Sequence, residues 1–173
     1  MVGTFDSKIQ NYTSREIVFS RSSWSPNGAF VVASQGITED RVFVSPVFAR
    51  GTWRLALNYV GHQLPTTVAR FNPVLFHQSQ PAGTPPKSFS VCAVGSMDKS
   101  ISVWRTNSPK PFAVFSHLFE ESVLDISWSS DGLSMMACSH DGQIVFVRSV
   151  SHSIGLRSHW CVVHAGRACL QVR

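Results

Sequence analysis

Residues 96–104 (SMDKSISVW) constrain the fold of this chain more than any other stretch. They read as a tight turn that runs into a strand. Alternation along that strand puts its two aliphatic residues on one face and Ser100, Ser102 and Trp104 on the other. An imperfect copy of the pattern recurs at 139–147 (SHDGQIVFV). A turn-and-strand unit that returns at a fixed distance predicts a repeat architecture.

Other landmarks return with a similar spacing. Asp98 and Asp141 lie 43 positions apart, and Trp24, Phe71 and Trp128 each stand just before a polar turn. Four short strands per unit of roughly 40–45 residues are typical of a β-propeller blade. We therefore expect an all-β fold, a WD40 β-propeller fragment of about three four-stranded blades in an open arc. Because a closed ring needs at least about four blades, we expect a fragment or a truncated product.

The expected organisation follows from where the strand and turn signals begin and end. It comprises an irregular N-terminal segment at 1–16, a degenerate WD40 blade at 17–60, a WD40 blade at 61–115 with an exposed Pro-rich loop at 74–87, a partial blade at 116–147, and a basic, disordered, non-propeller tail at 148–173.

Composition narrows the classes of function. Hydrophobic residues make up 43% of the chain and charged residues 14%, which favours a folded β protein over a disordered one. The formal net charge is +5. The excess lies in the tail, which has four arginines and no acidic residue, so we expect no direct binding of nucleic acid by the folded part. Neither an apolar run of about 18 residues nor a secretory signal pattern is found, and we expect no membrane association.

The middle repeat carries four polar or aromatic residues that suit a structural hydrogen-bond tetrad: His62, Ser96, Asp98 and Trp104. An indole N–H donates to a hydroxyl, a hydroxyl to an imidazole, and an imidazole to a carboxylate. Such a chain would tie the loop that enters the blade to its third strand. A hydrolase triad is the alternative for Ser, His and Asp. No G-x-S-x-G elbow is present, so we expect no catalytic residue.

Two further constellations are weaker. The third repeat retains a partial tetrad, His117, Ser139 and Asp141, with Val147 at the position of the tryptophan. In the tail, a metal site would have to use His159, Cys161, His164 and Cys169. Their spacing does not match a zinc motif, and we expect neither a metal nor a cofactor.

The sequence of the repeats resembles that of the HIRA family of histone chaperones over about residues 17–147. The resemblance lies in RSSWSPNG at 21–28, YVGH at 59–62, ARFNPVLF at 69–76, and above all CAVGSMDKSISVW at 92–104 followed by LFEESVLDISW at 118–128. It corresponds to the later blades of that family's N-terminal propeller. The tail departs from the family pattern.

The resemblance implies a non-catalytic, nuclear scaffold that takes part in replication-independent nucleosome assembly, chromatin organisation and transcriptional repression. Its implied partners are a ubinuclein-like subunit and the histone H3–H4 complex. The alternative is a WD40 adaptor of another kind, similar to the middle subunit of chromatin assembly factor 1 or to a ubiquitin-ligase substrate receptor. Partner-binding residues are not identified, but loops are the usual docking elements, which points to 35–40, 62–67 and 97–100.

Overall fold

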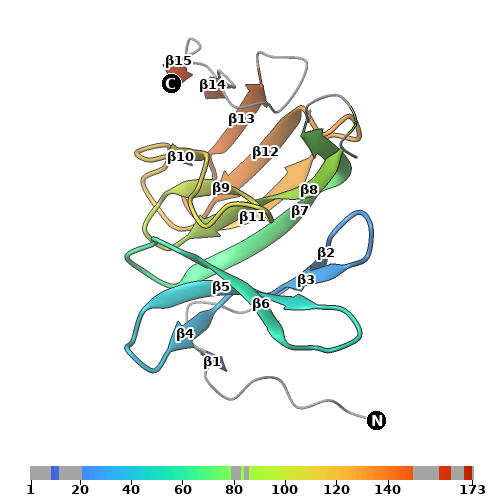
Figure 1. The fold of residues 1–173 in the computed structure, drawn as a ribbon. Coiled ribbons are helices and arrows are strands. Elements are labelled where there is room, and N and C mark those ends of the chain that lie inside the picture. The colour runs from blue at the N-terminus through green and yellow to red at the C-terminus, as the bar shows by residue number, and fades with distance from the viewer. Residues whose placement is uncertain are drawn as a thin grey trace.

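The computed structural model describes residues 9–11, 21–78, 83, 86–149, 160–164 and 170–172. All regular structure in these residues is β, arranged as three antiparallel sheets stacked side by side (Figure 1). The expectation of an all-β, three-bladed arc is confirmed. The N-terminal segment 1–16 lies outside the described residues except for one short strand, β1.

The first sheet, blue to cyan in Figure 1, is the most irregular of the three. Both β3 and β4 pair with β5, so they form successive halves of one strand position beside it. On the outer side, β6 pairs with the other edge of β5. On the opposite side, β2 pairs with β3 and β1 pairs with β4. The strands are β1 (Ile9–Asn11), β2 (Ser23–Trp24), β3 (Phe30–Val32), β4 (Gly36–Thr38), β5 (Phe43–Ala49) and β6 (Leu55–Val60).

The second sheet is a four-stranded meander, and it lies between the other two. Its strand β8 has eight consecutive buried residues, because alternate side chains enter the two cores on either side. Cys92 and Val94 pack toward the first sheet, and Val91 and Ala93 toward the third. The strands are β7 (Thr66–Gln78), β8 (Lys87–Ser96), β9 (Ile101–Arg105) and β10 (Ala113–Phe115).

Part of the expected Pro-rich loop 74–87 is strand. The β7–β8 ladder continues to the pair Gln78 and Lys87, and Phe76 stacks on Phe89 with ring centroids 5.9 Å apart. Pro73 does not end the strand, because a register shift at this point removes the need for its missing N–H. The expectation of a loop from residue 74 is therefore wrong for 74–78.

The third sheet has the order β11-β12-β13-β14-β15. The fourth strand comes from the expected disordered tail: β14 pairs with β13, and Trp160 packs edge-on against Phe115. The expectation of a wholly irregular tail is wrong for the residues of β14 and β15. The strands are β11 (Val123–Trp128), β12 (Ser134–Ser139), β13 (Ile144–Ser149), β14 (Trp160–His164) and β15 (Leu170–Val172).

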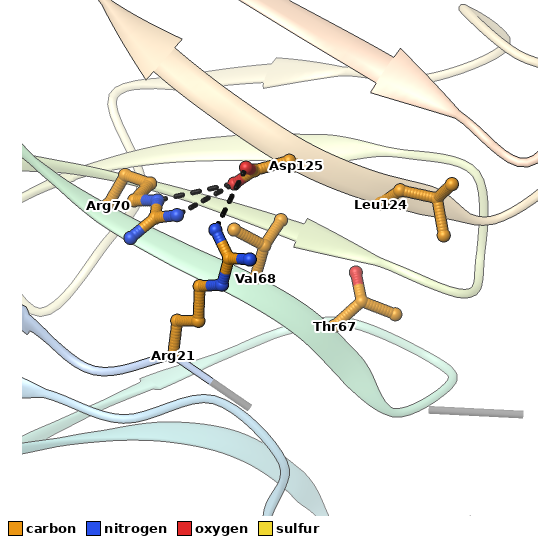
Figure 2. Close-up of a pocket in the computed structure, with 6 residues that line it drawn as sticks. All are labelled: Arg21, Thr67, Val68, Arg70, Leu124 and Asp125. Carbon is orange, nitrogen blue, oxygen red and sulfur yellow. Dashed lines mark hydrogen bonds and ion pairs between the residues drawn. The ribbon is translucent and has the colours of Figure 1, made fainter. Parts of the chain in front are cut away.

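The innermost strands β2, β7 and β11 are sheet edges that face one another. Side chains satisfy backbone groups across the gaps: the Phe71 N–H donates to Ser23 Oγ at 3.0 Å, and Trp128 Nε1–H donates to the carbonyl of Arg70 at 3.1 Å. Arg70 also pairs with Asp125 of β11 (Figure 2). Such cross-links protect edge strands that would otherwise present unpaired backbone groups.

One close approach of the second and third sheets requires a residue without a side chain. A Cβ on Gly95, in β8, would lie only 2.6 Å from Cγ1 of Val123. Any other residue type would overlap the side chains of Val123 and Val68 unless these side chains or their strands moved.

The described residues contain no helix with the length and apolar character that a membrane crossing requires.

Candidate functional site

The hairpin turn between β8 and β9 positions a carboxylate at one end of the second sheet. The Lys99 N–H donates to the carbonyl of Ser96 at 3.3 Å, and Lys99 adopts a left-handed backbone conformation, φ 68°. Asp98 Oδ1 accepts the Ser100 N–H at 3.1 Å and its hydroxyl. The other carboxylate oxygen is left to face the loop that connects β6 to β7.

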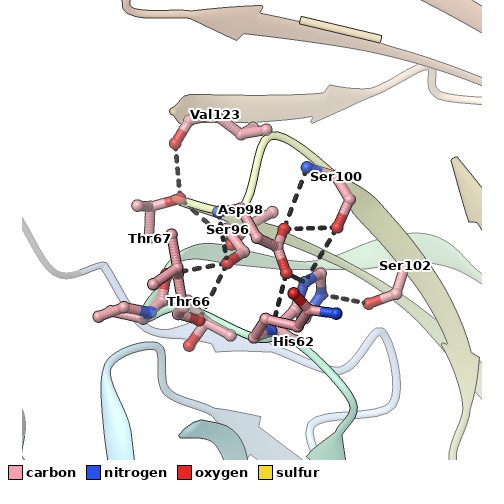
Figure 3. A network of polar contacts seen from close by, with 12 residues as sticks. His62, Thr66, Thr67, Ser96, Asp98, Ser100, Ser102 and Val123 are labelled. Carbon is pink, nitrogen blue, oxygen red and sulfur yellow. Dashed lines mark hydrogen bonds and ion pairs between the residues drawn. The ribbon is translucent and has the colours of Figure 1, made fainter. Parts of the chain in front are cut away.

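That loop supplies the imidazole (Figure 3). His62 Nδ1 lies 2.9 Å from Asp98 Oδ2, and the Gln63 N–H donates to the same oxygen at 3.0 Å. On the other side of the ring, His62 Nε2 lies 2.7 Å from the hydroxyl of Ser102. The side chain of His62 is 4% exposed and that of Asp98 15%.

Trp104 completes the network by donating its Nε1–H to Ser102 Oγ at 2.8 Å. An ionised carboxylate only accepts, so we assign the ring proton of His62 to Nδ1. Nε2 then accepts from Ser102, and Ser102 accepts from Trp104. Every polar group in the chain Trp104–Ser102–His62–Asp98 has a partner, which is the condition under which a buried polar network stabilises a fold.

The serine of the network is Ser102, whereas we predicted Ser96. Ser96 is buried, but its hydroxyl donates to the carbonyls of Leu64 and Pro65 at 3.0 and 3.1 Å, and it accepts the Asp98 N–H. It therefore joins loop to turn beside the network. The alternation of β9 could have identified Ser102, because residues two apart share a face and Ser102 precedes Trp104 by two.

Burial by itself raises the pKa of the Asp98 carboxyl. The hydrogen bonds from His62, Ser100 and the Gln63 N–H outweigh that effect. The pKa is held well below its usual range, and Asp98 is ionised at neutral pH. The site is thus electrostatically suited to hold an imidazole N–H.

The partial tetrad expected in the third sheet does not form as we predicted. Asp141 Oδ2 accepts the Glu120 N–H at 2.9 Å, as Asp98 accepts the Gln63 N–H. The residue that corresponds to His62 is therefore Phe119, which is buried, and not His117, which is exposed. Ser116-His117 resembles Gly61-His62 as a dipeptide but lies two positions too early.

Ser139 and Asp141 do share the geometry of their counterparts. Ser139 Oγ donates to the carbonyl of Glu121 at 3.1 Å, and the Gln143 N–H donates to Asp141 Oδ1 at 2.8 Å. Behind this turn the serine and tryptophan positions hold Val145 and Val147, and both are fully buried. The third sheet keeps the turn and replaces the polar network by apolar packing.

Comparisons with known proteins agree with this architecture. A model of the family described as WD domain, G-beta repeat, matches residues 109–146. The protein HIRA of Takifugu rubripes is 38% identical over 130 residues, and that of Homo sapiens 36% identical over 138 residues. The protein hir1 of Schizosaccharomyces pombe is 36% identical over 127 residues. These alignments cover 73%, 78% and 73% of the chain.

The chain belongs to the HIRA family. It spans about one seventh of the length of these relatives, between 13% and 14%. The family assignment therefore establishes that the chain is a WD-repeat segment of a HIRA-family protein.

Within this HIRA-family chain, Ser102, His62 and Asp98 have the order of contacts of a hydrolytic triad. Ser102 is 3% exposed, and its hydroxyl accepts the Nε1–H of Trp104 and lies 2.7 Å from His62 Nε2. The arrangement can hold a loop against a strand, and it offers no accessible nucleophile.

No group of three metal-ligating side chains is found among the described residues. Of the four tail residues weighed as ligands, Cys161 is disulfide-bonded, which removes its thiolate. His159 and Cys169 lie outside the described residues, and of His164 only the backbone is described.

The segments 62–67 and 97–100, predicted to bind partners, meet at one end of the second sheet. The third predicted segment, 35–40, is not the loop we expected, because Gly36–Thr38 form strand β4. The Met97 N–H donates to the carbonyl of Pro65 at 3.0 Å, and the Gln35 N–H donates to that of Thr66 at 3.1 Å. Leu64, on the same end, is 45% exposed although it is apolar. The use of these loops for partner binding stays a prediction.

Proposed function

We propose that this chain is a non-catalytic WD-repeat scaffold of a HIRA-like histone chaperone. Its role would be to dock protein partners in the nucleus during replication-independent nucleosome assembly, chromatin organisation and transcriptional repression. The observation that carries the proposal is the similarity to HIRA proteins over about three quarters of the chain. The burial of the Ser102–His62–Asp98 arrangement supports the non-catalytic part.

The docking surface we propose is the end of the arc formed by 35–40, 62–67 and 97–100. These three segments carry exposed charged side chains, Glu39, Asp40 and Lys99, as well as the exposed Leu64. Exposed charge around an exposed apolar side chain is the composition of a protein interface, with an apolar centre and a polar rim. The partners we expect are a ubinuclein-like subunit and the histone H3–H4 complex.

Affinity purification of the tagged chain from nuclear extract tests the proposal. We expect recovery of a ubinuclein-like subunit and of histones H3 and H4. The change Leu64→Asp should reduce that recovery at least about tenfold, because it places a charge at the centre of the interface. Val114→Asp is the matched control, since Val114 is 50% exposed on β10, the outer edge strand of the second sheet, and belongs to none of the three segments.

The alternative, a ubiquitin-ligase substrate receptor, predicts recovery of cullin components instead. Recovery of the subunits of chromatin assembly factor 1 would favour the other adaptor class. Equal loss of partners in the Leu64→Asp and Val114→Asp variants would contradict the proposed surface while leaving the family role in place.

A further inference from the structure

A pocket on the inner edge of the arc brings together residues from near β2 and from β7 and β11. Figure 2 shows the side chains converging. Its lining consists of Arg21, Thr67, Val68, Arg70, Leu124 and Asp125. The pocket lies where the edge strands of neighbouring sheets meet, so packing of one sheet face on another does not fill it.

The pocket carries an unbalanced positive charge. Arg70 donates through Nε at 3.3 Å and Nη2 at 3.0 Å, both to Asp125 Oδ1. Arg21 reaches the other carboxylate oxygen only at 3.9 Å, beyond hydrogen-bond distance, and its side chain is 63% exposed. Two guanidinium groups therefore face one carboxylate. Arg70 uses two of its five N–H donors in these contacts, and Asp125 accepts no hydrogen bond from Arg21.

An apolar wall adjoins these charges. Leu124, which is 49% exposed, and Val68, which is buried, both line the pocket. A guest that carried a single negative charge beside an aliphatic group would neutralise the excess charge and cover Leu124. Bidentate pairing of guanidinium with carboxylate favours that guest in geometry as well as charge.

We propose that this pocket binds a carboxylate carried beside an aliphatic side chain, as in an acidic segment of a protein partner. The inference goes beyond the proposed function, because it stands whichever partners the loop end of the arc recruits. A nucleic-acid backbone fits less well. A nucleic-acid backbone requires a row of cationic side chains, whereas the pocket has two arginines with Asp125 between them.

The direct test uses the full 173-residue chain and two small probes. N-acetyl-L-leucine has the carboxylate and the aliphatic group, and N-acetyl-L-leucinamide lacks only the charge. We expect millimolar N-acetyl-L-leucine to shift the side-chain Nε–Hε NMR signals of Arg21 and Arg70, and the amide to leave them in place. Absence of these shifts, or equal shifts with both probes, would overturn the proposal.

Variants separate this site from general attraction to a positive chain. Arg21→Gln should weaken binding of N-acetyl-L-leucine about tenfold through the loss of a charge-assisted pair. Asp125→Asn should strengthen it about threefold, because it removes a like charge. Arg54→Gln, an exposed arginine of the β5–β6 turn, should change nothing. Weaker binding in the Asp125→Asn variant would contradict the assigned role of the pocket.

Two further probes test the ligand class. If inorganic phosphate shifted both arginine signals as strongly as N-acetyl-L-leucine, the pocket would be a simple anion site and the aliphatic requirement would be wrong. If a short oligothymidylate bound more tightly than either, with a steep salt dependence lost in Arg21→Gln, a phosphate backbone would be the guest. We expect neither result.

Discussion

In both the second and third sheets, an aspartate in the hairpin turn accepts a backbone N–H from the preceding loop. Asp98 accepts from Gln63 at 3.0 Å, and Asp141 accepts from Glu120 at 2.9 Å. The serine two residues before each aspartate donates to a carbonyl of the same loop. The two sheets thus join loop to turn through the same contacts to the backbone.

Behind the turn the two sheets differ completely. The second sheet buries His62, Ser102 and Trp104 in one hydrogen-bonded chain, and the third buries Phe119, Val145 and Val147 in those positions. A buried polar group is tolerated when every partner is present and is destabilising when one is missing. The comparison teaches that the polar set and the apolar set are each self-consistent, so that single exchanges between them should fail.

The largest expected effect is that of truncating the indole. Trp104 is 1% exposed, stacks on Tyr59 with ring centroids 5.0 Å apart, and donates to Ser102. We expect Trp104→Ala to lower the free energy of unfolding by about 3–5 kcal/mol, because it leaves a large cavity. Val147→Ala, at the matching place in the third sheet, should lower it less. Urea unfolding measures both, and equal losses would show that Trp104 is not the main support of its sheet.

Moving one polar residue into the apolar set tests its self-consistency. Phe119→His would bury an imidazole near Asp141 with no hydroxyl for its second nitrogen, and we expect a loss of about 2 kcal/mol. Adding Val145→Ser supplies that hydroxyl. The double variant should recover about 1 kcal/mol relative to the sum of the single changes, measured as a coupling energy. Simple additivity would mean that the two positions do not communicate.

Lowering the pH should reduce the contributions of both Asp98 and Asp141 to the free energy of unfolding, and the contribution of Asp98 should fall further. The pKa of Asp98 is depressed in the folded chain, so its contribution is present above the unfolded value of about 3.9 and is lost as the pH falls below it. We expect Asp98→Asn to flatten the acid loss of stability. Hydrogen bonds to backbone N–H groups outweigh burial and also lower the pKa of Asp141, so Asp141→Asn should flatten it less, since that turn is exposed.

Unfolding followed from about pH 6 to pH 2 gives these two profiles. If the Asp98→Asn variant lost stability toward acid as steeply as the unaltered chain, the network around His62 would contribute nothing through ionisation. If Asp141→Asn had the larger effect, the exposed turn would be the more strongly coupled of the two.

Local signals were sufficient for part of this architecture. Alternation and turn residues located a hairpin turn and the strand that follows it within residues 96–104, and the structure has β9 there, from Ile101 to Arg105. They did not reveal that β7 continues beyond Pro73. A proline is a strong local breaker, and its tolerance depends on a register shift against β8.

Of the four residues in the hydrogen-bonded network, the sequence predicted three. His62, Asp98 and Trp104 follow from residue chemistry and order along the chain, and they meet as we expected. The choice of serine depended on which hydroxyl lies between ring and indole, and Ser96 and Ser102 are alike in type. Likewise, His117 was a better match than Phe119 as a residue, and only the contact of Asp141 with Glu120 showed the true correspondence.

By itself, the sequence determined the all-β repeat, the spacing of its units and the residues that turn each hairpin. Strands and turns depend on neighbours one to four positions apart, and their order along the chain then gives the spacing of the units. Tertiary structure alone decided which serine joins the network, that β14 completes the third sheet, and that Arg21 and Arg70 meet Asp125. These contacts join residues distant in sequence, and only the stacking of the sheets brings them within reach.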